Sequence, residues 1–144
     1  MEMQIDTPAL STEHQVREVA LLLMRMCGTI HDALRKSTSA PTQDISTLPY
    51  ALLTEEYALR SRANTLLIEA KRLARPGLGT SQQAILDVLQ ELHFGLESST
   101  SLQQLAELIN SVVLFANSLM SMNGRVILFL LNELKQTVNS SVVT

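Results

Sequence analysis

The sequence predicts an all-α fold: a four- to five-helix antiparallel bundle with a long, mostly buried C-terminal helix. Three observations support it: capping signals ahead of apolar runs, apolar residues at helical spacing, and an aliphatic composition with few aromatics. The 144 residues suffice for one domain with a sizeable core. We expect a flexible N-terminal segment at residues 1–11, a single helical bundle domain at 12–138 and a frayed tail at 139–144.

Three predicted helix starts carry the same signal, a threonine followed three residues later by a glutamine. The pairs are Thr12 with Gln15, Thr80 with Gln83 and Thr100 with Gln103. In such a capping box the hydroxyl accepts from a backbone amide that the helix start leaves unpaired, and the glutamine side chain returns to the cap's own backbone. Neighbouring serines can move each boundary by a residue: Ser11, Ser81 and Ser99.

The first predicted helix runs from about Glu13 to Lys36. Its apolar residues are spaced alternately by four and three positions, which is typical of a packing seam. They are Val16, Ala20, Leu23, Cys27, Ile30 and Leu34. A polar connection that contains Pro41 follows at residues 37–47, and we expect it to be the most mobile internal segment.

The second predicted helix begins between Leu48 and Glu56 and ends at Arg75, because a residue that precedes proline avoids helical backbone. Its seam alternates large and small side chains, which permits close approach of a partner helix. The seam consists of Leu59, Ala63, Leu66, Ala70 and Leu73. A Pro-Gly-Leu-Gly turn then leads to a shorter third helix at residues 81–94, with Gly95 as a left-handed stop.

The last predicted helix, residues 102–138, has polar residues on only one narrow stripe. The stripe consists of Gln103, Glu107, Asn110, Ser111, Ser118, Ser121, Arg125, Asn132 and Gln136, interrupted by Leu114 and Leu128. Such a helix must be covered by other helices or by a partner. Asn123 and Gly124 either end one helix and start another or leave a continuous, kinked rod. We expect the rod, because each residue costs at most about 1 kcal/mol inside a helix.

The net charge and the cysteine content indicate which partners and which cellular compartment to expect. A net charge of −3 and a pI near 5.6 argue against a nucleic-acid partner, which needs a basic face. The single cysteine, Cys27, cannot form an internal disulfide, so we expect an intracellular protein, cytoplasmic or nuclear. Neither a signal peptide nor a membrane span is predicted.

The three histidines, His14, His31 and His93, have no metal-ligand spacing, and we expect no metal, no cofactor and no small-molecule substrate. Arg25 and His31 resemble the Arg-His pair of HEPN ribonuclease domains, although six residues turn a helix by about 600° and place them on different faces. His31 also resembles the phosphoacceptor of histidine phosphotransfer domains, but Asp32 beside it disfavours a phosphoryl group. These are the enzymatic alternatives.

The excess of helical seam and the lack of a catalytic motif predict a non-enzymatic helical protein–protein interaction module. It would act as a homodimer or as a subunit or regulator in a larger complex. A narrower alternative is a small acidic chaperone or regulatory binding domain for a secretion or transcription factor. The expected packing or interface positions are Val112, Phe115, Leu119, Val126, Phe129, Leu130 and Leu134.

Overall fold

The structure is a computed structural model that describes residues 7–39, 48–99, 101–121 and 123–143. These residues form six helices and no strand, which confirms the all-α prediction. The expected mobile connection lies outside the described residues except at 37–39, which belong to the first helix and extend it beyond the predicted end at Lys36. The helices are α1 (Glu13–Ser39), α2 (Leu48–Ile68), α3 (Ala70–Leu73), α4 (Gln82–Ser98), α5 (Leu102–Met120) and α6 (Gly124–Val143).

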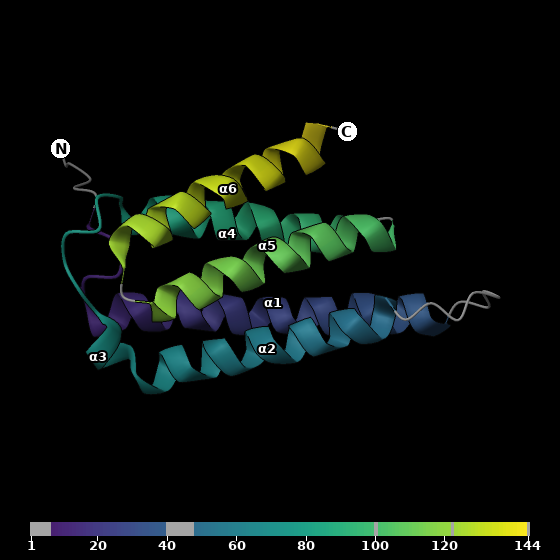
Figure 1. The fold of residues 1–144 in the computed structure, drawn as a ribbon, viewed down its shortest axis with the longest axis horizontal. Coiled ribbons are helices and arrows are strands. Elements are labelled where there is room, and N and C mark those ends of the chain that lie inside the picture. The colour runs from purple at the N-terminus through teal and green to yellow at the C-terminus, as the bar shows by residue number, and fades with distance from the viewer. Residues whose placement is uncertain (1–6, 40–47, 100, 122, 144) are drawn as a thin grey trace.

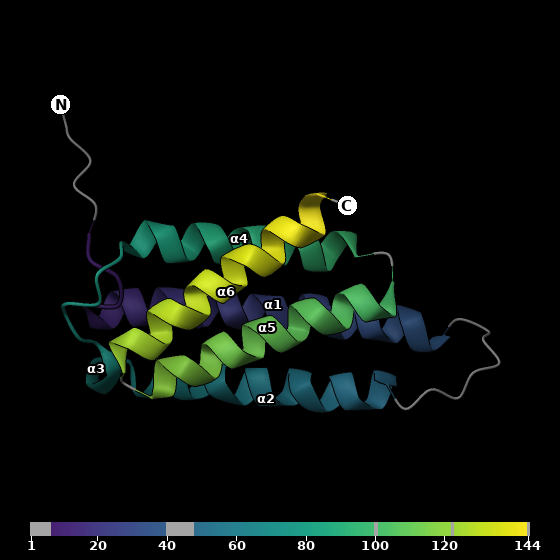
Figure 2. The ribbon, with the colours of Figure 1, turned by 45° about the horizontal axis from the view of Figure 1, so that its top comes forward.

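The five longer helices form a ring around one core (Figure 1). Helix α1 packs on α2 and α4, α5 packs on α2 and α6, and α6 packs on α4. Figure 2 shows α2, α1 and α4 as one layer, with α5 and α6 crossing in front of it. Consecutive long helices are antiparallel, whereas α4 runs parallel to both α1 and α6, and α2 runs parallel to α5.

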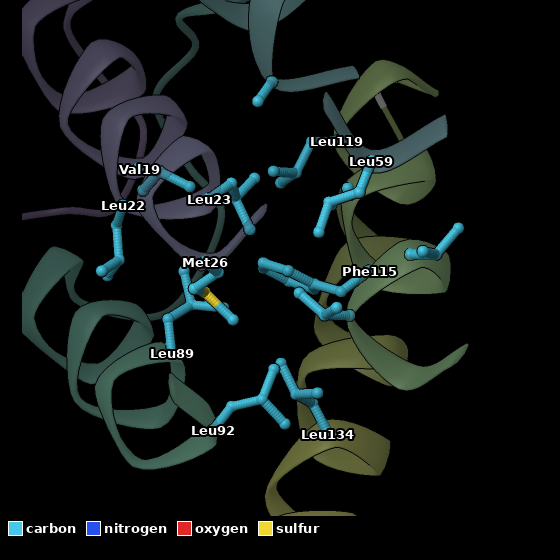
Figure 3. Packing of buried hydrophobic residues seen from close by; sticks show 14 of the residues in the cluster. Val19, Leu22, Leu23, Met26, Leu59, Leu89, Leu92, Phe115, Leu119 and Leu134 are labelled. Carbon is cyan, nitrogen blue, oxygen red and sulfur yellow. The ribbon is translucent and has the colours of Figure 1, made fainter. Parts of the chain in front are cut away.

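The core is built almost entirely from aliphatic side chains around a single aromatic ring, Phe115. Figure 3 shows this ring pointing from α5 toward Met26 of α1, with Leu89 of α4 and Leu134 of α6 close by. Phe115, Met26 and Leu89 are fully buried. Burying such side chains contributes about 1.5–3 kcal/mol each, so this layer holds the ring of helices together.

Of the three predicted threonine–glutamine capping boxes, the one at α1 is confirmed, whereas α4 and α5 are each capped by a serine outside the predicted pairs. At α1 the capping box is complete: the Gln15 amide donates to Thr12 Oγ1, and the Thr12 amide donates to Gln15 Oε1, both at 3.1 Å. At α4 the cap is Ser81, one residue beyond Thr80, as the neighbouring serine allowed. At α5 it is Ser101, whose hydroxyl accepts from the Gln104 amide at 3.0 Å.

The start of the chain is held against α4 from Thr7 onward, although residues 1–11 were expected to be flexible. The Ala9 amide donates to the Thr80 carbonyl, and the Gln82 amide donates to the Thr7 carbonyl, both at 2.9 Å. The buried Gln82 side chain accepts from the Leu10 amide and donates to the Gln15 carbonyl, each at 3.0 Å. Residues 1–6 lie outside the described part of the chain.

The expected long C-terminal helix is divided in two. Ser121 ends α5, and its hydroxyl donates to the Ser118 carbonyl at 2.6 Å. Asn123 then caps α6, because its Oδ1 accepts from the amides of Arg125 and Val126 at 3.1 and 3.3 Å. These bonds satisfy donors that a new helix start leaves unpaired, and α6 folds back onto α5 and α4. At the other end, α6 continues to Val143, into the expected frayed tail.

Two further boundaries differ from the expected ones. Helix α2 ends at Ile68, and a separate turn, α3, follows before Pro76. Helix α4 continues through Gly95, where a Cβ atom would lie 3.4 Å from the Leu108 side chain of α5. Gly95 therefore permits close helix packing and does not stop α4. The left-handed glycines are Gly77 and Gly79, in the turn before α4.

Candidate functional site

A fully buried carboxylate, Glu56, lies between α2 and α1. It occupies the inward face of α2, where its neighbours at helical spacing are Leu52, Leu59 and Ala63. An acidic residue at such a position is costly unless it is paired, since an isolated buried charge loses its hydration. Glu56 and the polar groups around it are therefore a candidate functional site.

Arg60 binds one oxygen of this carboxylate. Its Nε and Nη2 donate to Glu56 Oε2 at 2.9 and 2.5 Å, one helical turn away on α2. These hydrogen bonds to Glu56 hold the pKa of Arg60 above its ordinary value. The Arg60 side chain is 44% exposed, so the pair connects the core to solvent.

The other oxygen faces α1. His31 Nδ1 lies 3.5 Å from Glu56 Oε1, and the His31 side chain is 46% exposed. Within the described residues, Oε1 is buried and has no hydrogen-bond partner. The His31 ring therefore lies beside the buried carboxylate without a hydrogen bond to it and is partly open to solvent.

Cys27 lies one turn before His31 on α1 and is fully buried. Burial raises the pKa of its thiol to about 11, with nearby Arg60 lowering it and Glu56 raising it further. The nucleophilic form of cysteine is the thiolate, which burial disfavours here. Cys27 is therefore a packing residue of the α1 seam and not a reactive centre.

This raised pKa predicts a loss of stability in alkali. The folded thiol titrates near 11 and the unfolded thiol near 9.0, so the Cys27 contribution is fully present below the lower value and is lost as the pH rises through the upper one. As the pH rises from 9.0 to about 11, the free energy of unfolding of the native protein is expected to fall by about 1–3 kcal/mol more than that of the Cys27→Ala variant. Denaturant unfolding of both proteins across this range measures the difference. Parallel curves would contradict the prediction.

The other residues of the enzymatic alternatives are not joined to His31. Arg25 is exposed on α1, and no hydrogen bond or ion pair links it to His31 in the described chain. The Asp32 carboxylate lies 3.9 Å from Arg35, at the surface. Among the described residues no group of three or more His, Cys, Asp and Glu side chains lies close enough to hold a metal ion.

His93 makes a second polar contact, between α4 and α1. Its Nε2 lies 2.7 Å from Thr29 Oγ1 and 3.9 Å from Glu97 Oε2. A nucleophile, base and acid in series require the carboxylate on the opposite ring nitrogen from the hydroxyl. Both contacts here use the same nitrogen, so they do not form a catalytic triad. The Thr29 contact joins α4 to α1, and the Glu97 contact lies within α4.

The seven expected interface positions fall into two groups. Val112, Phe115, Leu119 and Leu134 are buried within the chain's own core, so they are packing residues and are not available to a partner. Val126 and Phe129 on α6 are exposed, and Leu130 is half-buried. The division of the last helix causes this difference, because folding α6 back onto α5 covers one face of each.

Comparison with models of protein families, with curated proteins and with solved structures gives no match. Among the described helices, none is both long enough and apolar enough to cross a membrane. A function can therefore be proposed only from the arrangement of this chain's own residues.

The sequence indicates part of the site around Glu56. Glu56 and Arg60 are four residues apart, a spacing that pairs opposite charges on a helix. Glu56 also continues the apolar spacing of Leu52, Leu59 and Ala63, which indicates an inward position. The approach of His31 depends on how α1 packs against α2, and a helical pattern alone does not specify that contact.

Proposed function

We propose that this chain is a non-enzymatic helical protein–protein interaction module, acting as a homodimer or as a subunit or regulator of a larger complex. The observation that carries the proposal is the exposed apolar surface of α6. Phe129 is 63% exposed and Val126 38% exposed, on a helix whose inward positions are already filled. Large exposed apolar side chains lose water favourably when a partner covers them.

The surroundings of these residues support a docking surface. Phe129 borders a groove of about 500 Å³ between α6 and the turn before α4, where Gly79 and Thr80 form the opposite wall. Leu128 also lines this groove. On the α5 side, Leu114 is exposed where the predicted polar stripe is interrupted. Exposed aromatic anchors beside a groove are typical of the residues that contribute most to an interface.

A double substitution tests this assignment. Val126→Asp with Phe129→Asp is expected to weaken association at least about tenfold while leaving thermal unfolding close to that of the native chain. The fold should tolerate both changes, because both positions are exposed and an acidic residue in the first turn of α6 suits the helix dipole. Light scattering and sedimentation measure self-association, and reconstitution with a co-purified partner measures a mixed complex.

Tyr57→Asp is the matched control, because Tyr57 is also 63% exposed but lies on α2. It should leave association unchanged. If the α6 double variant keeps both its fold and its association, α6 is not the interface. Substitution of Phe115 or Leu134 is not a useful test, because those buried residues hold the core together.

The remaining alternatives are narrower or have less support. A chaperone or regulatory binding domain for a secretion or transcription factor is a special case of the same proposal and requires the identity of the partner. An enzymatic role would rest on the His31 contact with Glu56 alone, since Arg25 and Asp32 do not join it. We therefore advance the interaction module as the single proposed function.

A further inference from the structure

A second surface, the groove between α4 and α6, combines an exposed aromatic ring with negative charge. The groove has a volume of about 530 Å³. Phe94, which is 64% exposed, stands in its wall. Helix α6 crosses in front of α4 in Figure 2, and the groove is lined by residues of both helices. Its lining consists of Asp87, Gln90, Glu91 and Phe94 from α4 and Asn139 from α6.

The negative charge of the groove has no cationic partner in the described chain. The sequence contains no lysine or arginine between Arg75 and Arg125, so α4 carries none. Asp87 accepts one hydrogen bond, from Gln83 Nε2 at 2.8 Å, and Glu91 makes no ion pair with any described residue. Lys135 of α6 lines the neighbouring groove and pairs with neither carboxylate.

The α4 wall forms a single stripe at helical spacing. Asp87, Glu91 and Phe94 are separated by four and three residues, so they lie in line along the helix. At a rise of 1.5 Å per residue, the stripe from Asp87 to Phe94 is about 10 Å long. A partner helix laid along it would place an apolar side chain on Phe94, one cation about a turn away at Glu91, and a second about two turns away at Asp87.

From this combination we infer that the α4–α6 groove is the docking site of a cationic amphipathic segment of a partner protein. The segment carries an apolar anchor for Phe94 and lysine or arginine side chains for Glu91 and Asp87. The inference rests on the proposed function, because it assigns a class of partner to a second surface of the same module. Charge complementarity selects the partner and speeds its encounter, and the aromatic contact contributes affinity.

The probe for this site is a labelled synthetic helix of leucine and lysine, about 18 residues long, with leucine on one face. Fluorescence anisotropy measures its binding to the full chain. Phe94→Ala, and Asp87→Asn with Glu91→Gln, are each expected to weaken binding about tenfold or more. A charge-reversed protein, Asp87→Lys with Glu91→Lys, is expected to lose the lysine peptide and to bind a matched leucine–glutamate peptide.

Two controls separate this site from a general attraction to an acidic protein. Glu107→Gln with Glu133→Gln removes two carboxylates from the groove between α5 and α6 and should change binding less than about twofold. Ile68→Ala removes an exposed apolar side chain from α2 and should have an equally small effect. If either control weakens binding as much as the groove variants, or if Phe94→Ala has no effect, the inference is overturned.

The remaining outcomes also decide the question. If the chain self-associates without peptide, and Phe94→Ala abolishes that association, the occupant is a second copy and the assigned class of partner is wrong. The Val126→Asp and Phe129→Asp variant should bind the peptide like the native chain. Failure of the α6 interface would therefore appear as unchanged association in that variant, and failure of the groove as unchanged peptide affinity in Phe94→Ala.

Discussion

Replacing Phe115 by alanine is expected to lower the free energy of unfolding by about 3–5 kcal/mol. The ring is fully buried and lies among side chains of α1, α4 and α6 that cannot all collapse into the space it leaves (Figure 3). Urea unfolding followed by circular dichroism measures the loss. Phe129→Ala is the control and should change stability by no more than about 0.5 kcal/mol, because Phe129 is exposed. Equal losses would contradict the core described for Phe115.

Replacing Arg60 by alanine is expected to destabilise the fold by about 2–3 kcal/mol. The substitution leaves the Glu56 carboxylate buried with one fewer partner, which is the costly way to break an ion pair. The expected loss is smaller than for a fully enclosed pair, because the Arg60 side chain is 44% exposed and partly screened by solvent. Denaturant unfolding near neutral pH measures it.

Two variants show whether the cost arises from the buried charge. Arg62→Ala removes a neighbouring arginine that donates to Asn117 Oδ1 at 2.8 Å on the surface, and it should cost less than about 1 kcal/mol. Glu56→Met combined with Arg60→Met removes both charges and keeps most of the side-chain volume. That protein should be close to the native chain in stability or above it. A double variant as unstable as Arg60→Ala would refute the argument.

Local chemistry made the fold class predictable. The Thr12 cap involves residues of a single helical turn, and the apolar seam of α1 repeats along a single helix. Both patterns can therefore be read directly from the sequence. The break before α6 was also visible in the sequence, as Asn123 and Gly124. The continuous rod is wrong because Asn123 accepts from the amides of Arg125 and Val126 and so stabilises the start of a new helix.

Contacts between residues far apart in the chain could not be predicted from the sequence pattern. Gln82 was expected to be an ordinary residue near a cap, yet its side chain joins α4 to Leu10 and to the start of α1. His31 and Glu56 belong to different helices, so no periodicity brings them together. The interface positions depended on the register of α6 against α5, which a narrow polar stripe does not specify.

The parallel pairing of α1 with α4 has a consequence for how the chain folds. The contacts of Gln82 with Leu10, Gln15 and Glu18 span 72, 67 and 64 residues, about half of the chain. Closing such long loops costs chain entropy before the contacts can repay it, whereas the α1–α2 and α5–α6 hairpins close over short connections. We therefore expect the α1–α2 and α5–α6 hairpins to form before α4 packs on α1, and the chain to fold more slowly than an up-and-down bundle of this size.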